Sequence, residues 1–109
     1  MYKKVLIVDD DASFAFLLMN KAVNHDCGFS LAESIGRARV MLKNNHYDII
    51  VANSRVPGGF SYTLKNDIAP DTQILFMSSM KSDYEKLHEM GENCIKKNEM
   101  YQKIEAICG

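Results

Sequence analysis

The 109-residue sequence lacks a surplus of charge of either sign. It carries 13 lysine and arginine residues against 14 acidic residues, its formal net charge is -1, and its basic residues are dispersed rather than gathered in one run. A segment that binds nucleic acid is expected to carry a concentrated basic surface. We therefore expect no binding of DNA or RNA through this chain.

Long apolar runs and paired cysteines are also lacking. No run approaches the roughly 20 apolar residues that span a bilayer, and the amino terminus enters a strand pattern without a signal-peptide pattern. We therefore expect a cytoplasmic protein with no membrane contact. Cys27, Cys94 and Cys108 are odd in number, widely spaced and free of any C-x-x-C pair. This spacing predicts reduced thiols rather than a disulfide framework.

The chain does contain enough apolar material for one core. Hydrophobic residues make up 47% of the sequence, and its length leaves no room for a second domain, so we expect residues 1–109 to form a single domain. Five short apolar stretches alternate with helical patterns, at 3–8, about 29–33, 48–52, 73–77 and about 94–96. Such alternation predicts βαβ units around a parallel sheet, and hence an α/β fold.

The first three intervals between these stretches differ in their helical signal. Apolar residues at helical spacing predict one helix in each of the first two intervals. The two sets are Phe14, Leu17, Leu18 and Ala22, and Ile35, Ala38 and Leu42. In the third interval, Pro57 and Pro70 leave room only for a short helix or a helical turn.

The last two helical segments have signals at their ends. The order Ser82-Asp83-Tyr84-Glu85 fits a capping box that begins the fourth helix, and Gly91 suits its far end. The fifth helix is expected over about 99–107, with Asn98 as its N-cap. Its expected buried residues are Met100, Ile104 and Ile107.

Polar side chains follow the first and third predicted strands. Asp9, Asp10 and Asp11 come directly after the first strand, and Asn53 comes directly after the third. If these strands are parallel neighbours, their carboxyl ends meet at the edge where open α/β sheets bind ligands. Adjacent carboxylates at the end of a buried strand call for a cation nearby. For Asp11 we favour a simpler role at a helix N-terminus.

Five short motifs stand in order at the predicted strand ends. They are Val5 to Asp11, Tyr47 to Ala52, Val56-Pro57-Gly58, Phe76-Met77-Ser78-Ser79 and Cys94-Ile95-Lys96-Lys97. In this order they resemble the receiver domains of bacterial two-component response regulators, over the whole chain. The resemblance implies a doubly wound, flavodoxin-like fold with a five-stranded parallel sheet in the order 2-1-3-4-5 and helices on both faces. It also implies that the third and fourth helical segments are shortened.

The resemblance further implies a site. In such domains an acid pair and a phosphoacceptor aspartate hold Mg²⁺, the aspartate takes a phosphoryl group from a histidine kinase, and a hydroxyl and a lysine steady the phosphate. By position, Asp10 is a direct metal ligand and Asp9 an indirect one. Ser78 supplies the hydroxyl and Lys97 the cation. The acceptor position holds Asn53.

Asn53 changes the chemistry that this site is expected to perform. A carboxamide carries no negative charge and is a poor nucleophile, so it forms no acyl phosphate. Affinity for Mg²⁺ should fall as well, because this hard ion prefers anionic oxygen. We therefore expect either no cofactor or weakly bound Mg²⁺.

Two further departures from the family pattern lie near the fifth strand. Cys94 stands where the family usually has an aromatic residue that swings inward on activation, so that switch is missing. Asn98 follows Lys97 where proline is usual. The position of Lys97 assumes a one-residue deletion before Cys94, and without the deletion Asn98 takes the place of the lysine.

A positive side chain of the protein itself is a candidate partner for the acid pair. Arg55 lies two residues past Asn53, and Lys97 is the family cation. Ion pairs from both would hold the site shut. The alternative for Arg55 is an ordinary solvated loop side chain.

The leading functional interpretation is a non-enzymatic, degenerate receiver that acts independently of phosphorylation. It would bind a protein, either a histidine kinase or an output domain, through the surface around the fourth and fifth helices. The alternative is a phosphorelay receiver whose acceptor aspartate is replaced or engineered to Asn53, or restored by deamidation. A nucleotide or flavin enzyme is disfavoured, because phosphate-binding turns use glycines and amides where this chain has three acids.

Overall fold

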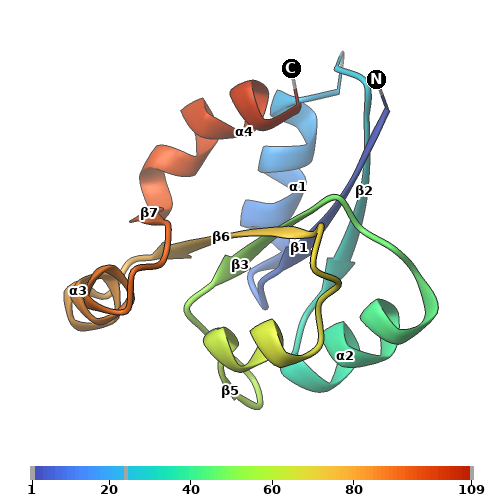
Figure 1. Ribbon diagram of the computed structural model, residues 1–109. Coiled ribbons are helices and arrows are strands. Elements are labelled where there is room, and N and C mark those ends of the chain that lie inside the picture. Colours follow the sequence, from blue (N-terminus) through green and yellow to red (C-terminus); the bar gives the residue numbers. More distant parts are fainter. Residues whose placement is uncertain (1, 24, 109) are drawn as a thin grey trace.

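The computed structural model describes residues 2–23 and 25–108, which form a parallel sheet with helices on both faces (Figure 1). The sheet has the order β2-β1-β3-β6-β7. Its strands are β1 (Lys3–Val8), β2 (Cys27–Ala32), β3 (Ile49–Asn53), β6 (Gln73–Ser78) and β7 (Cys94–Lys96). This arrangement confirms the predicted α/β fold, all five strands and their order.

Helices and a small hairpin complete the chain. The α-helices are α1 (Ala12–Lys21), α2 (Ile35–Asn44), α3 (Lys81–Glu89) and α4 (Met100–Cys108). Two 3₁₀ helices, η1 (Ser61–Asn66) and η2 (Lys97–Glu99), lie before β6 and before α4. Strands β4 (Arg55–Val56) and β5 (Gly59–Phe60) pair with each other in an antiparallel hairpin. No helix of the part of the chain described here is long and apolar enough to cross a membrane.

Both faces of the sheet are covered, which explains why β1 is an unbroken apolar run. Side chains alternate between the faces of a strand. Leu6 and Val8 pack with α2, η1 and α3, whereas Val5 and Ile7 pack with α1 and α4. All four are fully buried. A strand that is buried on both sides needs no polar alternation.

Helix α1 begins where the sequence predicts, but its buried face is different. The Asp11 carboxylate accepts a hydrogen bond from the Phe14 N–H at 3.1 Å, so Asp11 is the N-cap that we expected. Ala15 and Leu18 are fully buried. The prediction that Leu17 lies on the buried face is wrong, because its side chain is 54% exposed.

The third helical segment is confirmed as short, while the expected start of the fourth is wrong. Helix α3 begins at Lys81, and its N-cap is Met80 rather than Ser82. The reason lies at the end of β6, where the Ser78 hydroxyl accepts a hydrogen bond from the Met80 N–H, so that the turn into the helix begins two residues earlier than expected. The expected end is confirmed by Gly91, whose φ of 78° is readily adopted only by glycine.

The fifth helix is confirmed in place, but its predicted cap is wrong. A 3₁₀ turn precedes it, so Asn98 lies inside η2 instead of capping α4. The side chain that satisfies the first free amide is that of Glu99, which accepts a hydrogen bond from the Lys96 N–H at 3.1 Å. Met100 and Ile104 are fully buried, as predicted.

The buried thiols lead to a prediction about alkaline pH. Burial raises the pKa of Cys94 from 9.0 to about 11 and that of Cys108 to about 12, with a hydrogen bond to Cys27 as a further cause for Cys108. Because the unfolded chain loses these protons at lower pH than the folded chain, their contribution is complete below pH 9 and is lost as the pH rises.

Urea unfolding at pH 8 and at pH 10.5 measures this loss. We expect the free energy of unfolding to fall further for the natural chain than for the Cys94→Ala/Cys108→Ala variant, since lysine and tyrosine titration is common to both. Equal losses in the two proteins would contradict the prediction.

Candidate functional site

The strand register brings the predicted site residues to one edge of the sheet. Val8 pairs with Ala52, so Asp9, directly after β1, and Asn53, the last residue of β3, lie at the ends of neighbouring strands. Ser78 pairs with Lys96 in the last ladder, and Lys97 follows directly. The carboxyl ends of four parallel strands therefore carry the polar side chains that the sequence analysis selected. At this edge the side chains divide into two groups.

The first group is an ion pair between Asp9 and Lys97. Asp9 is fully buried, and its Oδ1 accepts a hydrogen bond from the Asp11 N–H at 3.0 Å. Its Oδ2 lies 2.9 Å from the Lys97 Nζ, which supplies the positive charge that a buried carboxylate requires. The same ammonium lies over the Phe14 ring, 4.5 Å from its centroid. Of Lys97 and Asn98, Lys97 is therefore the residue that contacts Asp9.

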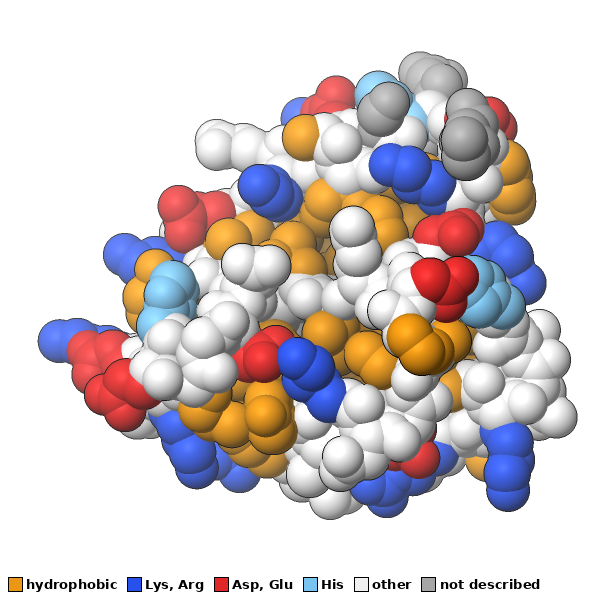
Figure 2. Space-filling model, viewed as in Figure 1, with side chains coloured by type: hydrophobic (Ala, Val, Ile, Leu, Met, Phe, Trp, Pro, Cys, Tyr) orange, Lys and Arg blue, Asp and Glu red, His pale blue; other side chains and the backbone are white. Residues whose placement is uncertain are grey.

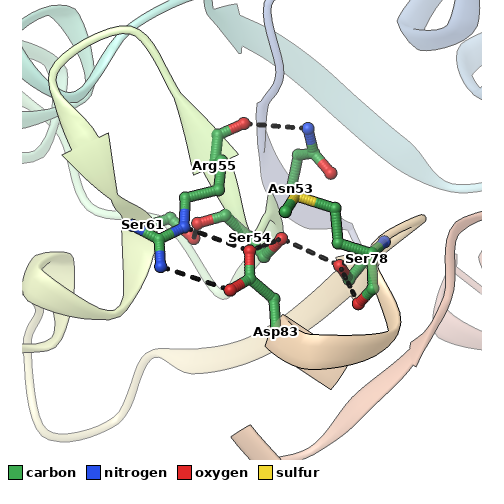
Figure 3. Close-up of polar contacts among 7 residues, drawn as sticks. Asn53, Ser54, Arg55, Ser61, Ser78 and Asp83 are labelled. Carbon is green, nitrogen blue, oxygen red and sulfur yellow. Dashed lines mark hydrogen bonds and ion pairs between the residues drawn. The ribbon is translucent and has the colours of Figure 1, made fainter. Parts of the chain in front are cut away.

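Asp10 and Asn53 take no part in this ion pair. Asp10 is exposed to solvent. The Asn53 side-chain amide donates a hydrogen bond to the Arg55 carbonyl at 3.0 Å, as Figure 3 shows. The Asn53 nitrogen is thus held by its own chain, and its remaining oxygen is a neutral acceptor.

These residues do not fit a tight magnesium site. Mg²⁺ prefers anionic oxygens in an octahedral arrangement. The Oδ2 of Asp9 already contacts an ammonium group, and Asn53 offers an amide oxygen without charge. Within residues 2–23 and 25–108, no group of three or more histidine, cysteine or acidic side chains is arranged to hold a metal ion.

The second group centres on Asp83, which the sequence analysis assigned only to a helix cap. The carboxylate is nearly buried and receives two hydrogen bonds from the Arg55 guanidinium (Figure 3). The Nε of Arg55 lies 3.1 Å from Oδ2 and its Nη2 lies 3.2 Å from Oδ1. This bidentate pair holds the pKa of Asp83 below its ordinary value.

The expected contact of Arg55 with the acid pair is therefore corrected. Arg55 begins β4, and its guanidinium extends to α3 rather than to Asp9. It lies over the Phe60 ring at 4.5 Å from the centroid, a contact made within the β4–β5 hairpin. The hairpin directs the side chain away from the end of β1, where Lys97 already pairs with Asp9.

Serine hydroxyls extend this second group to the end of β6. The Ser54 hydroxyl donates to Asp83 Oδ2 at 3.1 Å and lies 2.9 Å from the Ser78 hydroxyl. The Ser61 hydroxyl donates to the Ser54 carbonyl at 3.2 Å. We call Ser54, Arg55, Ser78 and Asp83 the Asp83 cluster. It joins the segment after β3, the end of β6 and the first turn of α3 into one hydrogen-bonded unit.

Sequence reasoning missed Ser54 and Asp83 as members of the site. Asp83 and Leu87 are the buried residues of α3, and they stand four residues apart on one helix face. An acidic residue at helical spacing from an apolar one was the available signal. Such spacing predicts that Asp83 lies on the buried face of the helix, but it does not predict that Arg55 is its partner.

Cys94 begins β7 beside Phe76 and is buried in the core. Its carbonyl lies 2.8 Å from the His88 Nε2 on α3. Cys94, which the sequence analysis noted as lacking the family's usual aromatic ring, is thus a small buried residue of the core. This packing leaves Cys94 as part of the core between β6 and α3.

Comparisons with known proteins support the fold. Neither a scan against protein-family models nor a search of curated proteins gives a match. The response regulator DrrB of Thermotoga maritima, an OmpR/PhoB homologue, superposes with a TM-score of 0.78 at 16% identity, over 97% of this chain and 50% of that one. A Burkholderia pseudomallei response regulator with a phosphorylated aspartic acid, calcium ion and citrate gives 0.80 at 18% identity, over 98% and 66%.

An isolated domain matches over almost its full length. The non-phosphorylated HemR receiver domain from Leptospira biflexa has a TM-score of 0.73 at 19% identity, over 95% of this chain and 94% of that one. The chain thus has the fold of response-regulator receiver domains, and it spans half of DrrB and 66% of the Burkholderia protein. At these identities the likeness concerns the fold alone.

The Asp9–Lys97 pair leads to a stability prediction. Lys97→Met leaves a buried carboxylate without its cation, so we expect the free energy of unfolding to fall by about 3–5 kcal/mol. The double variant Asp9→Asn/Lys97→Met removes both charges and should be more stable than the single variant. Urea unfolding of the three proteins measures this, and a double variant less stable than Lys97→Met would contradict the pairing.

The Asp83 cluster leads to a second prediction. Asp83→Asn should lower the free energy of unfolding by about 1–3 kcal/mol, because charged hydrogen bonds to a buried group are lost. The matched control is Asp67→Asn, whose exposed pair with Arg39 should contribute about 0–1 kcal/mol.

The pH dependence gives the same prediction a second readout. The folded-state pKa of Asp83 lies below 3.8, so its contribution is present above that pH and is lost as the pH falls through the folded value. The difference between the natural chain and Asp83→Asn should therefore shrink in acid. A constant difference, or a larger effect from Asp67→Asn, would contradict the role of the cluster.

Proposed function

We propose that this chain is a receiver-like module of two-component signalling that accepts no phosphoryl group and acts by binding a protein. The observation that carries the proposal is that both reactive positions already have partners within the chain. The Asp9 carboxylate contacts the Lys97 ammonium, and the Asn53 amide donates to a backbone carbonyl. A site satisfied in this way has little capacity for a metal ion or a phosphate.

In this proposal Asn53 stands at the phosphoacceptor position and Ser78 at the hydroxyl position. The Ser78 hydroxyl is held by the Ser54 hydroxyl and by the Met80 backbone. It therefore needs no phosphate to occupy a defined place. The connection between β6 and α3 that a phosphate would organise is made here by the Asp83 cluster. We infer a module with a single resting conformation rather than one switched by phosphorylation.

The proposed binding surface lies around α3 and α4, the fourth and fifth helical segments. A cleft of about 580 Å³ opens there, between the end of β6, the first turns of α3 and the residues after β7. Met80 and Tyr84 supply its apolar part, and Met80 is half exposed. Lys81 and Lys96 stand at the same cleft. Such a mixture suits a protein partner, which we propose to be a histidine kinase or an output domain.

A second function is favoured by one specific observation. Asp9, Asp10, Ser78 and Lys97 all remain at the carboxyl ends of the strands, so a single exchange of Asn53 for aspartate would complete the set that the resemblance implies. The alternative is thus a phosphorelay receiver whose acceptor aspartate is replaced by Asn53. In that case this chain is the inactive form of a protein that otherwise accepts a phosphoryl group.

Intact mass after incubation with acetyl phosphate and Mg²⁺ distinguishes the two. We expect no phosphoryl adduct on the natural chain, because the Asn53 amide is a poor nucleophile. An adduct on the natural chain would overturn the proposal. An adduct on Asn53→Asp alone would favour the alternative, with Asn53→Asp/Asp10→Asn as the control that should lose it. No adduct on any of the proteins would support the binding module.

A further inference from the structure

In the part of the chain that the structure describes, the amino-terminal half of β6 pairs with a strand on one side only. The ladder between β6 and β7 begins at Phe76 and Cys94, because β7 is only three residues long. The ladder with β3 begins earlier, at Gln73. Residues 73–75 therefore have a paired strand only on the β3 side.

The direction of the backbone groups identifies which residue is left unpaired. Gln73 donates its N–H to Asp48 of the β3 side, and Phe76 donates its N–H to Asn93 of the β7 side, at 3.0 and 2.9 Å. Alternate residues of a parallel strand bond to opposite neighbours, so Ile74 faces the same side as Phe76. Among residues 2–23 and 25–108, neither backbone group of Ile74 has a hydrogen-bond partner on that side.

A groove of about 990 Å³ runs along this open edge. It is bounded by the carboxyl half of α4, by the segment that leads into β7 and by the segment from η1 to β6. Ile68, Leu75 and Ile107 supply apolar surface, and all three are partly exposed. Figure 2 shows apolar side chains in a hollow across the middle of this face. We call this feature the β6-edge groove.

The charge of the groove is positive. Lys3, Lys65 and Lys103 line it, together with Glu92 as the one acidic residue. The Lys65 ammonium pairs with Glu92 at 2.7 Å, and Lys3 donates to the Ile107 carbonyl at 2.9 Å. Neither Lys3 nor Lys103 has a carboxylate partner in the described part of the chain. The ammonium groups of Lys3 and Lys103 are thus available to a carboxylate of a binding partner, beside apolar side chains at the floor of the groove.

We propose that the β6-edge groove binds an extended acidic segment of a partner protein. The free N–H and C=O of Ile74 call for a backbone in strand conformation, which supplies both kinds of partner. Apolar side chains on one face of that strand would lie on the groove floor. Carboxylates at its rim would pair with Lys3 and Lys103, whose charge complements them.

This groove lies at the opposite end of the strands from Asn53, Ser78 and the other residues of the candidate functional site. Ile74 is near the start of β6, whereas Ser78 is its last residue. The inference does not rest on the proposed function, and the two can fail separately. A chain that accepts phosphate and still binds an acidic strand would support this inference alone.

The test uses the full chain labelled with ¹⁵N and a synthetic, blocked peptide of alternating glutamate and valine. We expect saturable shifts of the amide signals of Ile74, Leu75 and Lys103, together with slower hydrogen exchange at the Ile74 amide. A peptide of alternating lysine and valine should cause neither change. Loss of the difference between the two peptides would overturn the proposal.

Two exposed variants provide matched controls. Lys103→Glu should weaken binding of the acidic peptide by about tenfold, since attraction becomes repulsion at the groove rim. Lys43→Glu makes the same change of charge on α2, away from the groove, and should leave the affinity unchanged. Equal weakening by both variants, no saturable shift, or shifts centred on α3 and Lys96 would each overturn the proposal.

Discussion

The buried charge of Asp9 is the constraint on which the functional edge of the sheet depends. A carboxylate with no exposed surface is stable only beside a positive charge, and that charge comes from Lys97 at 2.9 Å. Lys97 follows β7, whereas Asp9 follows β1, with β3 and β6 between those strands. The pair therefore connects the residue after the edge strand β7 to the residue after β1, inside the sheet. The same contact places an ammonium group against the Asp9 oxygen at this edge.

The Asp83 cluster performs the corresponding role between β3, β6 and α3. Its hydrogen bonds join Ser54 and Arg55 to the first turn of α3, whose Leu87 packs in the core of the protein. The Asp9–Lys97 pair and the Asp83 cluster are thus both held by contacts within the protein. The buried carboxylates Asp9 and Asp83 both lie against a positive side chain of the same protein, which favours one fixed arrangement of this edge. The receiver fold is kept, and in the proposal made above these internal contacts take the place of a bound metal ion and phosphate.

The brevity of β7 explains why the opposite edge is open. Three residues are enough to bring Lys97 to Asp9, but they pair with only the second half of β6. The first half is left beside a groove rather than beside a strand. An open edge with apolar surface invites unwanted pairing, and lysines are a common means of limiting it. At the β6-edge groove the lysines also give the edge a preference for acidic partners.

Much of this protein can be predicted from its sequence. Apolar periodicity indicates five strands and five helical segments, because the period of burial is a local property of each element. The acid pair after β1 and Asn53 after β3 could be assigned to one edge, since the carboxyl ends of parallel strands meet there. The N-cap role of Asp11 could be predicted for the same local reason. The starts of α3 and α4 were less predictable, because the turns into them are fixed by hydrogen bonds from the Met80 and Lys96 N–H groups to Ser78 and Glu99 rather than by the expected caps.

The partner of each buried charge was decided by tertiary structure. Sequence position placed both Arg55 and Lys97 within reach of the acid pair, yet the direction of the β4–β5 hairpin takes Arg55 to Asp83. Asp83 itself is buried because Leu87 packs α3 against the core. The sequence by itself determined the five strands and the edge of the sheet at which the acid pair, Asn53 and the residues after the later strands gather. Only the packing of elements distant in the chain decided which charges meet, because ion pairing depends on distances in space that no local pattern contains.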